Sequence, residues 1–164
     1  MNACVLTTIH KKLTTTNYCL LPLACCLIQM SETTSPELTP QINIFLDSKD
    51  YIYHPGDCLT GFYTILDVIT DQIVSVELTV FWHTEGKGDE DLTIIDYQLL
   101  SRRKEDWINP NTPIKIETTL PLSPLSYEGT LIKIRWAVRV CMTLDSGKEI
   151  VSERVFFLKK HESV

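Results

Sequence analysis

From Gln41 onward, apolar residues recur at every second position in short runs that end in turn residues. This period is typical of β-strands with one buried face, whereas an amphipathic helix repeats every 3.6 residues. No segment shows an apolar stripe of helical period, and Asp145 to Lys148 predicts a hairpin turn. The pattern predicts seven strands, at residues 41–46, 58–68, 73–82, 92–100, 114–119, 130–144 and 150–158.

In two of these strands one face is apolar, and we expect that face to be covered by other parts of the protein. The strand at 130–144 has its basic residues Lys133, Arg135 and Arg139 on one side, and we expect them to pair with acids on neighbouring strands such as Glu77 or Glu149. Its other side carries Ile132, Ile134, Trp136, Val138, Val140 and Met142. In the strand at 73–82 the predicted buried face consists of Val74, Val76, Leu78, Val80 and Trp82, with Phe81 on the opposite face.

Antiparallel strands that each bury one face must close into a barrel or pack against a second sheet. The sandwich is the more common solution for short strands separated by turns. The predicted fold class is therefore all-β, an antiparallel β-sandwich of about seven strands with an immunoglobulin-like arrangement.

The first 29 residues differ in composition from the rest. They hold four of the six cysteines and both lysines of the pair Lys11-Lys12, but no Asp or Glu. A secretory or lipoprotein signal ending at Cys25 is one interpretation, although Pro22 interrupts its apolar region. A membrane anchor would need about 20 apolar residues, more than 18–30 provides. The favoured interpretation is a physiological start at Met30.

These observations give an expected domain organisation. Residues 1–29 are a doubtful extension, 30–40 a disordered polar tail, 41–160 the sandwich domain, and 161–164 a frayed end. After residue 29 only two cysteines remain, Cys58 and Cys141, which suits a reducing compartment. We therefore expect a cytoplasmic protein. An exported, envelope-surface sandwich is the alternative if residues 1–29 act as a signal.

Two segments resemble motifs of a known family. Residues 53–61 resemble the Y-x-P-G-[DE]-x-[LV]-x-G turn of arrestin-like N-terminal domains through Tyr53, Pro55, Gly56, Asp57 and Gly61. Residues 120–129 are similar to the family's proline-containing connection and lead into its long strand, with matching residues Pro121, Pro124, Tyr127, Gly129 and Trp136. The resemblance implies an arrestin-like sandwich, and the chain has length for one such module.

An acidic segment follows the strand predicted to end at Trp82. Two glycines and several charges occur there before the next strand, and we expect a surface loop. Its candidate partner-binding residues are Trp82, His83, Glu85, Lys87, Asp89, Glu90 and Asp91. A solvated turn is the simpler interpretation. A calcium or zinc site is a weaker alternative, because the potential ligands His83, Glu85, Asp89 and Asp91 lack the spacing of an EF-hand.

The charge balance and the motifs limit the possible functions. A net charge of −6 disfavours nucleic acid and anionic membrane surfaces as partners, and no catalytic triad or cofactor motif is evident. We predict a non-enzymatic protein-interaction or scaffold module without a cofactor or an integral membrane segment. It would bind a protein partner through a sheet edge or the segment 83–91, and sheet edges could also support self-association. The alternative is a metal-dependent module or enzyme centred on the acidic segment.

Overall fold

The computed structural model describes residues 39–87, 90–103, 109 and 112–161. The predicted extension at 1–29, most of the predicted tail at 30–40 and residues 162–164 lie outside these ranges. One short 3-10 turn, η1 (Thr70–Gln72), is the helical element of the described chain. The strands are β1 (Gln41–Leu46), β2 (Ile52–Tyr53), β3 (Cys58–Leu66), β4 (Ile73–Gly86), β5 (Leu92–Ser101), β6 (Ile114–Thr119), β7 (Tyr127–Glu128), β8 (Ile132–Leu144) and β9 (Glu149–Leu158).

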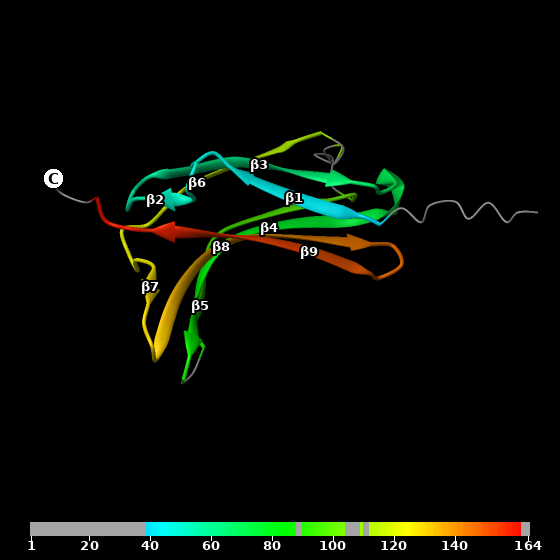
Figure 1. The fold of residues 1–164 in the computed structure, drawn as a ribbon. Coiled ribbons are helices and arrows are strands. Elements are labelled where there is room, and N and C mark those ends of the chain that lie inside the picture. Colours follow the sequence, from blue (N-terminus) through cyan, green and yellow to red (C-terminus); the bar gives the residue numbers. More distant parts are fainter. Residues whose placement is uncertain (1–38, 88–89, 104–108, 110–111, 162–164) are drawn as a thin grey trace, which may run out of the picture. The chain divides into compact units, whose positions relative to one another are not determined.

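The strands form two sheets that pack face to face (Figure 1). One has the order β1-β3-β6, and the other has the order β2-β9-β8-β4-β5, with β7 added beside the start of β8. All pairings are antiparallel except the short parallel one between β2 and β9. The all-β sandwich and its seven predicted strands are confirmed. The two-residue strands β2 and β7 are too short to show a sequence period.

The core lies between the two sheets and is centred on β8. Trp136, Val138, Val140 and Met142 are completely buried, and the indole N–H of Trp136 donates to the carbonyl of Pro124 at 3.0 Å. Burial of side chains of this size contributes about 1.5–3 kcal/mol each. The side chains that meet them from the three-stranded sheet include Ile44, Leu59, Tyr63, Ile65 and Ile116.

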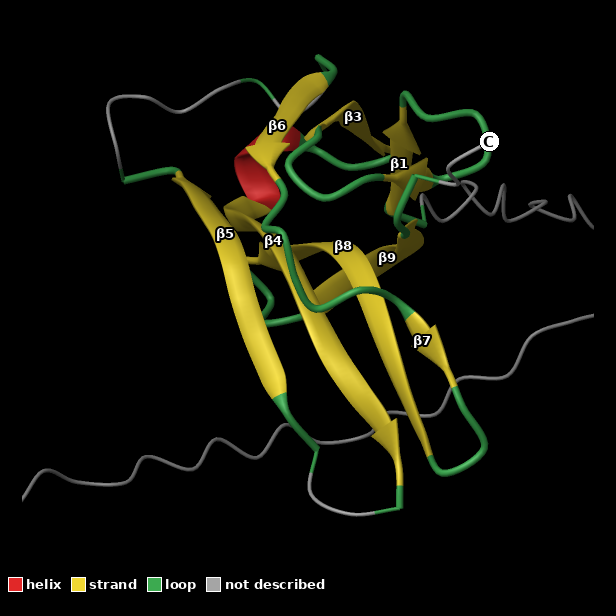
Figure 2. Cartoon of the chain, turned by 90° about the vertical axis from the view of Figure 1, so that its left-hand side faces the viewer, coloured by secondary structure: helices red, strands yellow, loops and turns green. Residues whose placement is uncertain are grey.

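The six-stranded sheet extends beyond the three-stranded one at one end (Figures 1 and 2). We call this part the projecting end, formed by β7, the start of β8 and the end of β4. The prediction of an unbroken buried face on β8 is wrong here, because Ile132 is 43% exposed and Ile134 is only half-buried. Both side chains keep the alternation of the strand, but the second sheet does not reach them.

The predicted alternation of β4 also needs correction. A register shift opposite β8 between Ile73 and Ser75 buries Ile73 and Val76 and leaves Val74 exposed. Trp82 is half-buried. Phe81 lies on the outer face, as predicted, yet it is only 2% exposed, because the guanidinium of Arg139 covers its ring at 4.7 Å.

The residues of the arrestin-like motifs have structural roles. In the turn before β3, Gly56 has a φ of +86°, and the Asp57 carboxylate accepts the backbone N–H of His54 at 2.8 Å. A Cβ at Gly61 would lie 2.2 Å from the carbonyl oxygen of Phe45, so only glycine allows β1 to pair here. The carbonyl of Pro124 accepts the hydrogen bond from the indole N–H of Trp136. These residues shape the sandwich.

Candidate partner-binding site

The acidic segment is largely strand, not the predicted surface loop. β4 does not end at Trp82 but continues to Gly86, and His83 and Glu85 pair with β8. The connection to β5 is reduced to Lys87 and the residues up to Asp91. Of the remaining candidates, Glu90 and Asp91 are exposed, while Asp89 lies outside the described residues. Charged residues indicate a loop when read alone, but here the strands on both sides of β4 satisfy its backbone.

Charged side chains meet on the outer face of the projecting end. Arg135 Nε donates to Glu85 Oε2 at 2.7 Å, and Arg135 Nη2 lies 3.6 Å from Glu128 Oε2. Lys133 Nζ lies 2.5 Å from Glu128 Oε1, and His83 Nε2 lies 3.2 Å from Glu85 Oε1. These five residues form what we call the outer-face cluster.

The basic stripe on β8 is paired, as predicted, but with other partners than Glu77 and Glu149. Arg139 binds Glu153 of β9, with Nη2 2.9 Å from Oε2. The register explains this choice, because it places Arg139 opposite Glu153 and Lys133 opposite Glu128. Cross-strand neighbours therefore determine which acid each base contacts.

The ion pairs lower the pKa values of the two carboxylic acids in the cluster. The hydrogen bond from Arg135, then that from His83, holds the pKa of Glu85 below its usual range. The bond from Lys133 likewise lowers the pKa of Glu128. Glu85 is thus engaged in ion pairs within the fold. Across the described residues, no three His, Cys, Asp or Glu side chains are arranged to hold a metal ion.

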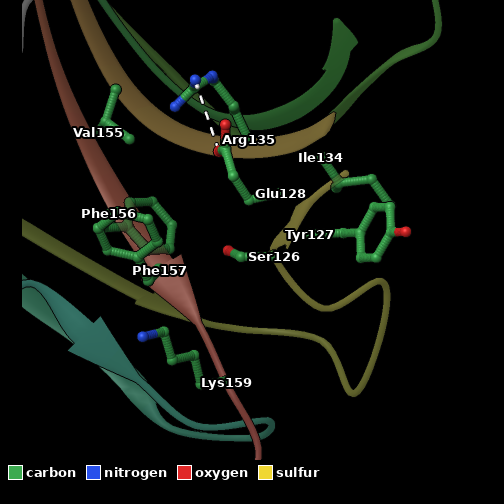
Figure 3. A pocket seen from close by; sticks show the side chains of 9 residues that line it. All are labelled: Ser126, Tyr127, Glu128, Ile134, Arg135, Val155, Phe156, Phe157 and Lys159. Carbon is green, nitrogen blue, oxygen red and sulfur yellow. Dashed lines mark ion pairs between the residues drawn. The ribbon is translucent and has the colours of Figure 1, made fainter. Parts of the chain in front are cut away.

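A pocket of about 340 Å³ lies beside this cluster, between β7 and the end of β9 (Figure 3). Two hydrogen bonds hold β9 beside the segment that leads into β7: the Ser126 N–H donates to the carbonyl of Leu158, and the Leu158 N–H donates to Ser126 Oγ, both at 2.9 Å. We call this cavity the β7–β9 pocket. Its lining is Ser126, Tyr127, Glu128, Ile134, Arg135, Val155, Phe156, Phe157 and Lys159.

Along its edge away from β8, β9 has backbone groups that no described strand pairs with. The N–H groups of Phe157 and Lys159 donate to the carbonyls of Tyr51 and Tyr53 at 2.8 and 2.9 Å, on the side away from β8. Because N–H direction alternates along a strand, the N–H and C=O groups of Val151, Glu153 and Val155 point to this same side. No described strand pairs with them. We call these three residues the β9 edge.

The predicted partner-binding candidates at 82–91 include no residue of the pocket or of the β9 edge, although a sheet edge was the predicted kind of site. A signal was present, since the strand predicted at 150–158 is apolar on both faces at Ile150-Val151 and again at Val155-Phe156-Phe157. Val151 and Val155 are 55% and 36% exposed. An apolar residue on the solvent side of a sheet is a sign of a contact surface, particularly where several occur together.

Comparisons with known proteins support the fold. No protein-family model and no curated protein matches the chain. The crystal structure of Spo0M, a sporulation control protein from Bacillus subtilis, is similar with a TM-score of 0.53 and 17% identity. The similarity covers 74% of this chain and about half of Spo0M, 50% of its length. This similarity supports an arrestin-like fold for the sandwich, and no family model confirms membership of that family.

In the part of the chain that the structure describes, no helix is long and apolar enough to cross a bilayer.

Proposed function

We propose that this protein is a non-enzymatic, regulatory protein-interaction module that binds an extended segment of a partner protein at the β9 edge. The observation that carries the proposal is the row of unpaired backbone groups at Val151, Glu153 and Val155, flanked by exposed valine side chains. An extended peptide can add to such an edge, where main-chain hydrogen bonds provide affinity and the alternating side chains provide selectivity.

The edge at β5, the other outermost long strand of this sheet, is less suited to a partner strand. β5, at the opposite end of the sheet order, is bulged, because Val80 and Phe81 oppose Asp96 and Ile94 and leave Ile95 unopposed. A neighbouring strand approaches each of the two edges, since the hydroxyl of Thr118 on β6 donates to Asp96 Oδ2 at 2.6 Å and β1 lies beside β9. The bulge is therefore the difference between them, and bulges protect an edge against pairing. The pairing of β8 and β9 shows no such irregularity.

Two further observations support the role and its compartment. Spo0M is named a sporulation control protein, and a similar fold in this chain favours a regulatory function over catalysis. The thiols of Cys58 and Cys141 are not joined in a disulfide. Reduced thiols are what the cytoplasm maintains, so we place the interaction there.

A peptide selection tests the proposal with the full chain. Random heptapeptides displayed on phage are selected against the immobilised protein, and the enriched peptides are then measured against Val151→Pro. Proline removes an outward N–H from the β9 edge without touching the ladder to β8. We expect the enriched peptides to lose most of their affinity for this variant.

The matched control is Tyr97→Pro on β5. Tyr97 lies on the other outermost long strand of the same sheet and its N–H points away from β4, so the same chemical change is made at the edge that we do not expect to bind. Equal loss of binding in both variants, or unchanged binding in Val151→Pro, would contradict the proposal. Circular dichroism of both variants confirms that the sandwich is intact.

A further inference from the structure

The β7–β9 pocket combines apolar and charged side chains in its lining. Its lining includes the apolar side chains Ile134, Val155 and Phe157 and the buried ring of Phe156. At about 340 Å³ it lies at the small end of the range of ligand pockets, about 300–1,000 Å³. It has room for one apolar side chain with its own main-chain group, but not for a strand that continues through it.

The charges around the pocket do not cancel completely. Within the outer-face cluster, the carboxylates of Glu85 and Glu128 balance the cations of Lys133 and Arg135. Lys159, at the other end of the pocket, makes no ion pair with a described residue, and its ammonium lies 5.3 Å from the ring centre of Phe157 (Figure 3). The pocket therefore presents one uncompensated positive charge in a protein whose net charge is −6.

We propose that the β7–β9 pocket binds the C-terminal residue of a partner protein, with an apolar side chain of leucine or phenylalanine size against Val155 and Phe157 and the terminal carboxylate at Lys159. The inference goes beyond the proposed function, because the pocket lies on the side of β9 that faces β7 and β8, whereas the β9 edge lies on the other side. A carboxylate gains a charge-assisted hydrogen bond from the ammonium, while the apolar lining removes the side chain from water.

The test uses the full chain labelled in its isoleucine and valine methyl groups and follows the methyl signals of Ile134 and Val155 by NMR. Three peptides serve as probes: acetyl-Ala-Ala-Leu with a free carboxylate, the same peptide with a terminal amide, and acetyl-Leu-Asp-Ala amide, which carries its carboxylate internally. We expect the free-carboxylate peptide to shift both methyl signals and to bind about fivefold more tightly than either of the others.

Two variants assign the preference to one side chain. Lys159→Gln is expected to abolish the difference between the acid and the amide. Lys160→Gln, which changes the neighbouring exposed lysine that does not line the pocket, leaves the difference intact. Equal affinities of the acid and the amide in the unmodified protein would overturn the proposal, as would tighter binding of the internal aspartate peptide or no shift at Ile134 and Val155.

Failure of this inference is distinguishable from failure of the proposed function. If none of the three peptides shifts the methyl signals while the selected heptapeptides still require an open edge at Val151, the pocket assignment is wrong and the edge assignment stands. If the heptapeptides also bind Val151→Pro as tightly as the unmodified protein, both the pocket assignment and the edge assignment are wrong.

Discussion

The strands β5 and β9 lie at opposite sides of the same sheet and differ in how firmly they are attached to the core. β9 places Phe156 and Leu158 completely in the interior, and the ring of Phe156 lies 5.7 Å from that of Trp136. None of the ten residues of β5 is fully buried, and the strand is bulged at Ile95. A docking strand must hold its hydrogen-bonding groups in fixed positions before the partner arrives. The comparison favours β9 as the docking strand.

The largest difference between the two strands is expected in stability. Phe156→Ala removes a buried ring from the core beneath β9 and should lower the free energy of unfolding by about 3–5 kcal/mol. Tyr97→Ala on β5 removes a half-exposed ring and should cost less than about 1 kcal/mol. Urea unfolding measures both. If the two variants lost similar amounts of unfolding free energy, β5 and β9 would not differ in how firmly they are attached to the core.

Proline substitutions distinguish the two sides of β9 itself. Ser152→Pro removes an N–H that points at β8, and the loss of this ladder bond should cost about 1–3 kcal/mol. Val151→Pro removes an N–H that points to solvent and should cost less than about 1 kcal/mol. Thermal unfolding compares them. If Val151→Pro destabilised the protein as much as Ser152→Pro, the edge would be paired in solution.

Removal of the bulge should make β5 resemble β9. Deletion of Ile95 brings Ile94 and Asp96 into regular alternation opposite β4 and restores a continuous edge with exposed apolar residues. We expect concentration-dependent self-association, because continuous apolar edges pair with one another. Light scattering at increasing protein concentration measures it. A strictly monomeric deletion variant would show that the bulge does not protect this edge.

The smallest expected effect concerns the ion pairs beside the pocket. In Arg135→Gln the Glu85 carboxylate loses its main hydrogen bond, so its pKa should rise toward the usual value. Because folding lowers this pKa, the stabilisation is present above the pKa of the unfolded chain and is lost as the pH falls through the folded value. An NMR titration of the Glu85 side chain follows the change. If the pKa of Glu85 did not change, the hydrogen bond from Arg135 would not be the cause of its lowered value.

The sequence was sufficient for the fold class because a period of two runs through β1, β3 and most of β8. It could not show where the second sheet ends, and so Ile132 was assigned to the core although it lies on the projecting end. It also could not show which cross-strand neighbour each base meets, since register depends on the whole sheet. Arg135 therefore pairs with Glu85, a residue first considered as a partner or metal ligand.

The candidate site shows the same limit. The charges clustered along the acidic segment predicted a partner-binding loop, yet Glu85 and His83 lie in a strand and form ion pairs within the sheet. The pocket is made by residues that are far apart in sequence, from Ser126 to Lys159, and each of them is ordinary in isolation. Only the pairing of β7 beside β8, next to the end of β9, brings them together.

Amide hydrogen exchange along β9 tests the central claim most directly. In the free protein, we predict that the N–H groups of Val151, Glu153 and Val155 exchange rapidly, whereas those of Ser152, Arg154 and Phe156 are protected by β8. Addition of a selected heptapeptide should protect the first three and leave the edge of β5 unchanged. Protection of these three groups in the free protein, or protection by the peptide at Tyr97 and Leu99 instead, would contradict the assignment of β9 as the docking strand.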